Sequence, residues 1–446
     1  MNPKKLKLLI KRQRSLHTYI DCKSKLEFKM NENQRKNMDV INHLNISKEK
    51  ESKFPRNSSF NSNKKLSSKP KIMKDSSKSG INLPKITKSK FIPKVNINYK
   101  KVDKNLPKSS KNLNTENNIF IKENNIEVIY NNKNSISLTQ KGFFFEKNIE
   151  REYNQDCSLI LEEVCGIKNY NIYSIMDGHG SNGHLVSNFI KQKIILYFND
   201  ISFYFKKIKN KSKDIVFPEN ILELIKKKLT KNNYQKLKEF FKSIDESLSS
   251  IEVRFDSNFS GSTCILIFQL GSYIISCNIG DSRALLIKDN KDIIELSKDH
   301  KPENEEEKKR IIDMGGIVSQ CNDLYDDGKK GGPFRVWMKG CDYPGLAMSR
   351  SIGDKIAHSI GVINEPEIKE FNIKDDDKFI IMGSDGVWQF LNNDDIINIL
   401  FNKDINWNDN DMRENICKKI INKAKNNFFE NDEYIDDITV SLIFLK

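Results

Sequence analysis

Short apolar runs that end at glycine and aspartate are the clearest pattern in this sequence. Residues 170–180 read YNIYSIMDGHG, and the apolar segment there stops abruptly at Asp177. Similar runs occur at 272–283 (SYIISCNIGDSR) and at 378–388 (KFIIMGSDGVW). Each run is typical of a buried β-strand bounded by turn-forming residues. The sequence therefore predicts several carboxylates at the ends of buried strands.

Helical spacing of apolar residues alternates with these strand patterns after about residue 119. It predicts helices at 183–198 and at 234–253, with the lysine-rich residues 205–232 between them forming an enlarged loop. A charged helix is expected from about Pro302 to Gly315, because these residues suit its two ends.

The remaining segments complete the expected domain. Residues 319–345 are polar and glycine-rich, which indicates an irregular flap. Strands are expected at 119–130, 135–144, 260–287 and 438–445, a hairpin around Gly166, and helices at 394–403 and 411–426. Many antiparallel strands with clustered helices predict an α+β fold with one large core over residues 119–446.

The basic charge of the chain is confined to its N-terminal quarter. Residues 1–110 hold 29 basic and 8 acidic residues, whereas the rest hold 46 basic and 52 acidic, so the net charge of +15 arises from this extension. Residues 1–118 are rich in Lys, Asn and Ser and lack a periodic apolar pattern, so we expect them to be disordered. Residues 1–16 either remain a solvated arm or form a short basic helix that contacts an acidic partner, a nucleic acid or a membrane surface.

Targeting and redox signals point to a cytoplasmic or nuclear protein. No apolar stretch reaches the length of a membrane span, and residues 8–10 are too short for a signal-peptide core. Asn2 stands where N-myristoylation requires glycine. The 8 cysteines are widely spaced and form no CxxC pair, which is typical of reduced thiols.

Several ordered motifs give the chain a resemblance to the metal-dependent protein serine/threonine phosphatases of type 2C. The resemblance covers most of residues 135–446, and two segments, 180–187 and 332–354, are similar to the protist branch of that family. It implies a sandwich of two antiparallel β-sheets flanked by helix pairs, with a metal centre at one end. The motifs are RxxNQD (151–156), DGHG (177–180), SGST (260–263), NIGDSRA (278–284), GLAMSRSIGD (345–354), GSDGVW (383–388) and DDITV (436–440).

The resemblance assigns metal ligands by position within the motifs. Asp177 corresponds to the carboxylate that bridges two cations, with the Gly178 carbonyl on one of them, and Asp385 and Asp436 are ligands of the other. Oxygen ligands suit Mg²⁺ or Mn²⁺, and two such cations neutralise a phosphate dianion and generate hydroxide at neutral pH. The implied reaction is attack of a metal-activated water on phosphorus.

Two further residues have implied catalytic roles. His179 is the general acid that protonates the leaving Ser or Thr oxygen, and Arg151 holds phosphate oxygens. For both, a purely structural role stays open, as a hydrogen-bonded turn histidine and as a solvated arginine.

Other residues in or near these motifs have structural or secondary roles. Asp281 either fixes the GDSR turn or holds a third, loosely bound metal. Gln155 reaches a metal only through water. His184 and Asp354 are expected to be structural, with Asp354 bracing the flap and its arginine network, and His300 is expected to mark the entry to a helix.

Two positions depart from the family pattern. Asp437 stands where Asn is usual, which adds a negative charge beside Asp436. Gln389 stands where a carboxylate is usual, so a third cation should bind weakly there unless Gln389 merely hydrogen-bonds a neighbouring loop.

The sequence thus predicts a monomeric Mg²⁺- or Mn²⁺-dependent phosphatase acting on phosphoproteins. The alternative is a phosphatase-like scaffold or binding protein with weak turnover. A metal-dependent nuclease is disfavoured because the part after residue 110 is net acidic, whereas a nucleic-acid groove should be basic.

Overall fold

The computed structural model describes residues 126–445 except 133, 146–148, 201–218, 251–252, 321–331, 402–405, 408 and 433. The predictions for residues 1–118 and for most of the loop between the first two helices lie outside this part of the chain. Within it, no helix is long and apolar enough to cross a membrane.

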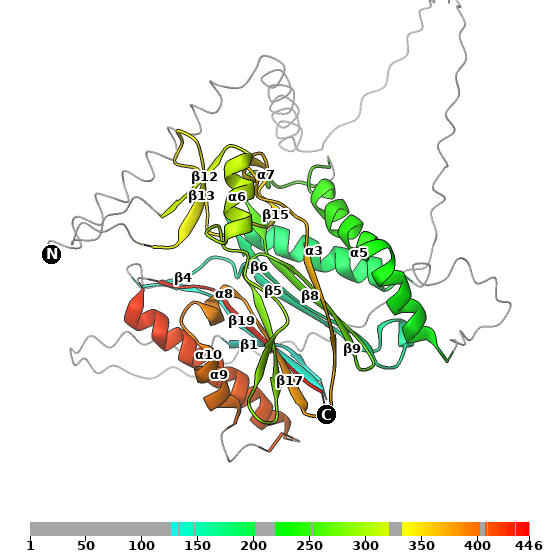
Figure 1. The fold of residues 1–446 in the computed structure, drawn as a ribbon. Coiled ribbons are helices and arrows are strands. Elements are labelled where there is room, and N and C mark those ends of the chain that lie inside the picture. Colours follow the sequence, from blue (N-terminus) through cyan, green and yellow to red (C-terminus); the bar gives the residue numbers. More distant parts are fainter. Residues whose placement is uncertain are drawn as a thin grey trace, which may run out of the picture. The chain divides into compact units, whose positions relative to one another are not determined.

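Two antiparallel sheets form the centre of the fold (Figure 1). The first sheet has the order β1 (Ile126–Asn131), β2 (Ser135–Gln140), β19 (Ile438–Phe444), β17 (Asp377–Gly383), β10 (Arg283–Lys288) and β11 (Ile293–Glu295). The second has the order β15 (Ile352–Gly353), β7 (Gly261–Ser262), β6 (Tyr170–His179), β8 (Cys264–Leu270), β9 (Tyr273–Ile279) and β16 (Glu367–Asn372), with β5 (Asp156–Leu161) paired to β6.

Helix pairs cover the outer faces of both sheets (Figure 1). Helices α3 (Gly183–Phe198) and α5 (Ile221–Ser247) pack on the second sheet, and α9 (Asn393–Leu400) and α10 (Asn410–Asn431) pack on the first. A third apolar cluster, which includes Tyr173, Ile267 and Met382, fills the space between the sheets. The predicted α+β sandwich flanked by helix pairs is therefore confirmed.

Local predictions were accurate where apolar periodicity was strong. The hairpin around Gly166 is present as β5 and β6, joined by a short 3-10 turn (Val164–Gly166), and α3 has the predicted bounds. The charged helix α6 (Glu305–Asp313) ends before Gly315, which has φ +87°.

The predicted enlarged loop is wrong in its last part, because α5 begins at Ile221. Ile221, Ile225 and Leu229 are buried at helical spacing, but lysines between them hid this pattern in the sequence. The helix breaks at residues 231–234, where three consecutive residues have positive φ. The predicted helix therefore corresponds to the second half of α5.

The flap prediction also needs correction. In the described part of this region, β12 (Gly316–Gln320), β13 (Phe334–Met338) and β14 (Pro344–Leu346) form a three-stranded antiparallel sheet where an irregular segment was expected. Val318 faces Val336 across the first pair, and Ile317 faces Trp337. These cross-strand apolar pairs stabilise the sheet, although glycine and polar residues around them weakened the strand pattern.

The remaining elements are short and lie next to the sheets. They are β3 (Phe143–Phe144), β4 (Ile149–Glu150), β18 (Tyr434–Ile435), α7 (Lys355–His358) and α8 (Asp385–Trp388).

Candidate active site

The end of β6 carries the first group of predicted site residues. Asp177 pairs in register with Asp156 on β5, and its backbone N–H donates to Thr263 Oγ1 at 2.9 Å. Gly178 packs so closely that a Cβ there would lie 2.4 Å from the Gly183 carbonyl oxygen. The DGHG segment is thus held against the start of α3, and only glycine fits its second position.

The first sheet brings a second carboxylate to the same place. β17 ends at Gly383, and Asp385 opens α8 two residues later. The backbone N–H of Asp385 donates to Asp177 Oδ2 at 3.4 Å. Ser384 Oγ donates to Asp156 Oδ2 at 2.7 Å, so two adjacent residues connect the end of β17 to strands β5 and β6 of the other sheet.

These half-buried carboxylates repel one another. Burial raises the pKa of Asp177 well above its usual range, and Asp385 raises it further. Burial and the neighbouring Asp281 raise the pKa of Asp385. Burial and Asp385 raise the pKa of Asp436 to about 7, although Arg151 opposes the shift. A divalent cation bound among these carboxylates would relieve their repulsion and favour their ionised form.

Arg151 lies between two adjacent carboxylates. Its Nη1 is 2.7 Å from Asp436 Oδ1 and 2.9 Å from Asp437 Oδ2. Burial lowers the pKa of Arg151, but both aspartates outweigh this effect and raise it overall. The structure therefore brings Arg151 to the site rather than leaving it solvated.

Asp437 organises this part of the site, a role that the sequence did not reveal. Its Oδ1 accepts the backbone N–H of Gly142 at 2.7 Å, and its Oδ2 accepts that of Gln155 at 2.9 Å. The side chain is 2 % exposed. The only sequence signal was an aspartate where the family usually has asparagine.

His179 and Asp354 form an ion pair. His179 Nε2 lies 2.5 Å from Asp354 Oδ2, and Asp354 is 4 % exposed. Burial lowers the pKa of His179, but Asp354 outweighs it and the pKa is raised overall. Asp354 was expected to brace the flap. It instead contacts the predicted general acid, because its left-handed backbone (φ 46°) precedes α7 beside β7.

The other residues near the site have the following contacts. Lys301 Nζ lies 2.5 Å from Asp281 Oδ2, so a lysine already neutralises Asp281. Gln155 Nε2 donates to the Gly180 carbonyl at 2.6 Å. His300 is buried and bonds to Gly280 through Nδ1, so it supports the GDSR turn rather than the entry to α6.

Gln389 lies on the exposed end of α8. Its Nε2 is 3.4 Å from Asp432 Oδ2, next to the C-terminal end of α10. This contact agrees with the alternative that Gln389 bonds a neighbouring loop.

The donor set suits a hard cation. Asp177, Asp385 and Asp436 offer carboxylate oxygens, and the buried Oδ1 atoms of Asp156 and Asp281 have no hydrogen-bond partner. Within the described residues, no group of three or more Asp, Glu, His or Cys side chains is arranged so that it could hold a metal ion. Arg151 pairs with Asp436, and Lys301 pairs with Asp281. The assignment of a cation site therefore rests on the chemistry and charge of the donor atoms.

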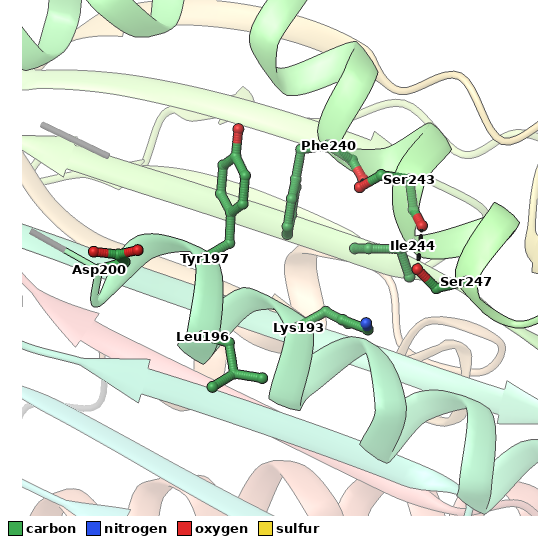
Figure 2. A pocket seen from close by; sticks show the side chains of 8 residues that line it. All are labelled: Lys193, Leu196, Tyr197, Asp200, Phe240, Ser243, Ile244 and Ser247. Carbon is green, nitrogen blue, oxygen red and sulfur yellow. Dashed lines mark hydrogen bonds between the residues drawn. The ribbon is translucent and has the colours of Figure 1, made fainter. Parts of the chain in front are cut away.

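A cavity of about 420 Å³ between α3 and α5 is separate from this site (Figure 2). The rings of Tyr197 and Phe240 lie side by side there, with centroids 4.4 Å apart. It is near the C-terminal end of α3, whereas the carboxylates lie near the N-terminal end. Its lining residues are Lys193, Leu196, Tyr197, Asp200, Phe240, Ser243, Ile244 and Ser247.

Two curated plant proteins are similar to this chain in sequence. The chain is 32% identical over 263 residues to Probable protein phosphatase 2C 73 of Arabidopsis thaliana, covering 57% of this chain and 67% of the relative. It is 28% identical over 324 residues to Probable protein phosphatase 2C 35 of the same plant, covering 69% and 83%.

Solved structures show the same fold. The serine-threonine phosphatase 2C of Toxoplasma gondii superposes with a TM-score of 0.54 at 16% identity, covering 72% of this chain and 99% of that one. Plant and Toxoplasma proteins both match, so the comparisons assign no branch. The sequence profile of the family described as Protein phosphatase 2C matches residues 169–432, which is more than half of the chain. The chain therefore belongs to the protein phosphatase 2C family of Mg²⁺- or Mn²⁺-dependent protein serine/threonine phosphatases.

Proposed function

We propose that Asp177, the Gly178 carbonyl, Asp385 and Asp436 hold two Mg²⁺ or Mn²⁺ ions for hydrolysis of phosphoserine and phosphothreonine in proteins. The observation that carries this proposal is the contact between the Asp385 N–H and the Asp177 carboxylate, which joins the two sheets at a cluster of half-buried acids. When bound, the cations neutralise the phosphate dianion and provide hydroxide at neutral pH.

Arg151 binds the phosphate oxygens in this proposal. Its contacts with Asp436 and Asp437 are both made by Nη1, so Nη2 and Nε remain as donors. A guanidinium offers planar, forked N–H groups that match phosphate oxygens. The two aspartates fix the direction of the group before substrate arrives.

His179 is proposed to protonate the leaving Ser or Thr oxygen. Its Nε2 faces Asp354, whereas its buried Nδ1 has no hydrogen-bond partner. Asp354 favours the protonated imidazole, which is the form of His179 that can donate a proton. Asp354 acts as a positioning residue, because it contacts His179 rather than substrate.

The alternative of a weakly active scaffold has one observation in its favour. Lys301 pairs with Asp281, and the neutral Gln389 contacts Asp432. Less negative charge is therefore available to bind a third cation. Asp281 is thus the least supported of the proposed ligands. A third metal, if it binds, should be weak.

Partners and compartment are also proposals. Phosphoproteins are the substrates that the family implies, and the basic residues 1–118 suit an acidic partner or a membrane surface. The free cysteines of the described chain are mostly buried, which suits the cytoplasm or nucleus. The similarity of segments 180–187 and 332–354 supports the protist branch.

An activity assay of the purified chain tests the proposed reaction. Hydrolysis of a phosphothreonine peptide should require Mn²⁺ or Mg²⁺, stop on chelation and resume when metal is restored. Full activity in excess chelator would contradict the metal assignment. Binding of phosphopeptide with negligible turnover at saturating metal would favour the scaffold alternative.

A further inference from the structure

The loop between β4 and β5 is fixed at several points but exposes one large side chain. Arg151 is held by Asp436 and Asp437, Asn154 Nδ2 donates to Thr139 Oγ1 at 2.8 Å, and Gln155 bonds the Gly180 carbonyl. Tyr153 lies within this fixed loop and is 51% exposed. Its position is therefore determined by its neighbours, although its ring is open to solvent.

The ring of Tyr153 stacks on an imidazole of α3. The centroids of the Tyr153 and His184 rings are 4.2 Å apart and their planes differ by 8°. His184 directly follows Gly183, whose carbonyl packs against Gly178. The stacked pair thus joins two segments of the candidate active site, the loop that contains Arg151 and the start of α3 beside Gly178.

A carboxylate lies beside this aromatic surface. The exposed Glu152 directly precedes Tyr153, and its carboxylate raises the pKa of the Tyr153 hydroxyl. No Lys or Arg of the described chain forms an ion pair with Glu152. The loop therefore presents an aromatic face and an unneutralised negative charge together.

We propose that Tyr153, supported by His184 and accompanied by Glu152, forms a subsite for an arginine near the phosphorylated residue of the substrate. The inference rests on the proposed phosphatase function, since it concerns substrates of that same site. A guanidinium lies flat on an aromatic ring while its N–H groups pair with a carboxylate, which the ammonium of lysine does less well.

The subsite lies within reach of a short peptide. Tyr153 is two residues from Arg151, the proposed phosphate ligand, so their Cα atoms are at most about 7 Å apart. An extended peptide advances about 3.3 Å per residue. An arginine one to three positions from the phosphorylated residue can therefore reach the ring.

A set of matched phosphothreonine peptides tests this proposal on the full chain. The peptides differ only in carrying Arg, Lys, Leu or Ala at each of the three positions on either side of the phosphothreonine. For the parent, kcat/KM should be about threefold to tenfold higher with Arg than with Ala at the preferred position. The difference should lie in KM, because the contact is remote from the reacting atoms.

Variants assign the preference to this surface. Tyr153→Ala should bring the Arg-to-Ala ratio close to one, Tyr153→Phe should keep part of it, and Glu152→Gln should reduce it. Leu196→Ala is the matched control, because Leu196 is 69% exposed at the other end of α3. That variant should keep the parent's ratio.

The outcomes separate this inference from the proposed function. Three outcomes would contradict the subsite but not the proposed phosphatase function. They are equal hydrolysis of all peptides by the parent, a preference for Leu, and an Arg preference that persists in Tyr153→Ala. If the parent with Mn²⁺ hydrolysed neither the peptides nor p-nitrophenyl phosphate, the proposed function and the subsite would both be wrong.

Discussion

Nε2 of His179 lies 2.5 Å from Oδ2 of Asp354, although the two residues are 175 positions apart in the chain. This contact predicts that Asp354→Asn lowers kcat for a phosphoserine peptide by about tenfold to a hundredfold, because the general acid loses its partner. Asparagine tolerates the left-handed backbone of residue 354, so the fold should persist.

A substrate with a better leaving group provides the control. p-Nitrophenolate leaves without protonation, so Asp354→Asn should slow p-nitrophenyl phosphate hydrolysis much less than peptide hydrolysis. Steady-state rates on both substrates measure the difference. Equal losses would indicate that Asp354 does not act through proton donation by His179.

Asp437 predicts a large effect on stability. Its carboxylate serves the N–H groups of Gly142 and Gln155 and the guanidinium of Arg151. Asp437→Ala leaves these donors without their acceptor and should reduce the free energy of unfolding by about 3 to 5 kcal/mol. Asp437→Asn keeps one acceptor oxygen and should cost less. Urea unfolding without metal measures whether stability decreases from the parent to Asp437→Asn to Asp437→Ala. If Asp437 were only a surface charge, this order would be reversed or absent.

Glu307 predicts a pH dependence of stability. Burial raises the pKa of Glu307, but hydrogen bonds from Arg350, Arg310 and Ser349 outweigh it and hold the pKa well below the usual 4.5. An acid whose pKa is lowered by folding stabilises the fold at pH values above the pKa that it has in the unfolded chain. That stabilisation should decline as pH falls below about 4.5, where the unfolded chain takes up the proton.

Glu307→Gln tests this dependence. The variant should lose about 3 kcal/mol of unfolding free energy at pH 7, and the gap to the parent should narrow below pH 4.5. Asp313→Asn, in an exposed pair on the same helix, is the control and should have no measurable effect. A gap between Glu307→Gln and parent that is constant from pH 7 to pH 3 would contradict the assigned pKa shift.

Gln389 predicts a change in metal requirement. It lies 3.4 Å from Asp432, so Gln389→Asp would place two carboxylates together at the end of α8. We expect this variant to lower the Mn²⁺ concentration for half-maximal rate, because a charged ligand replaces an amide. Superimposable titrations of parent and variant would mean that this position takes no part in metal binding.

Strand-end carboxylates were predictable from sequence because the signal is local. Asp177 and Asp385 each follow an apolar strand within a few residues of a glycine, and tertiary packing then joins the two strand ends. The first half of α5 was missed although its buried isoleucines have helical spacing, because lysines dominate the composition there.

Side-chain partners could not be predicted in the same way. Asp437 meets Arg151 across 286 positions of sequence, and no local pattern indicates which distant donor a buried carboxylate will bind. The flap sheet was missed for a related reason, since its strands are stabilised by cross-strand pairs such as Val318 and Val336. Such contacts are determined by the folded chain rather than by periodicity.

Calorimetric titration of Mn²⁺ into the parent and Asp177→Asn, both freed of metal, tests the central claim most directly. The parent should bind Mn²⁺ at the carboxylate cluster. Asp177→Asn should lose most of this binding and its peptide hydrolysis, yet unfold at no lower temperature without metal, because the substitution removes repulsion among half-buried acids. Undiminished Mn²⁺ binding by the variant would contradict the assignment of Asp177 as a metal ligand.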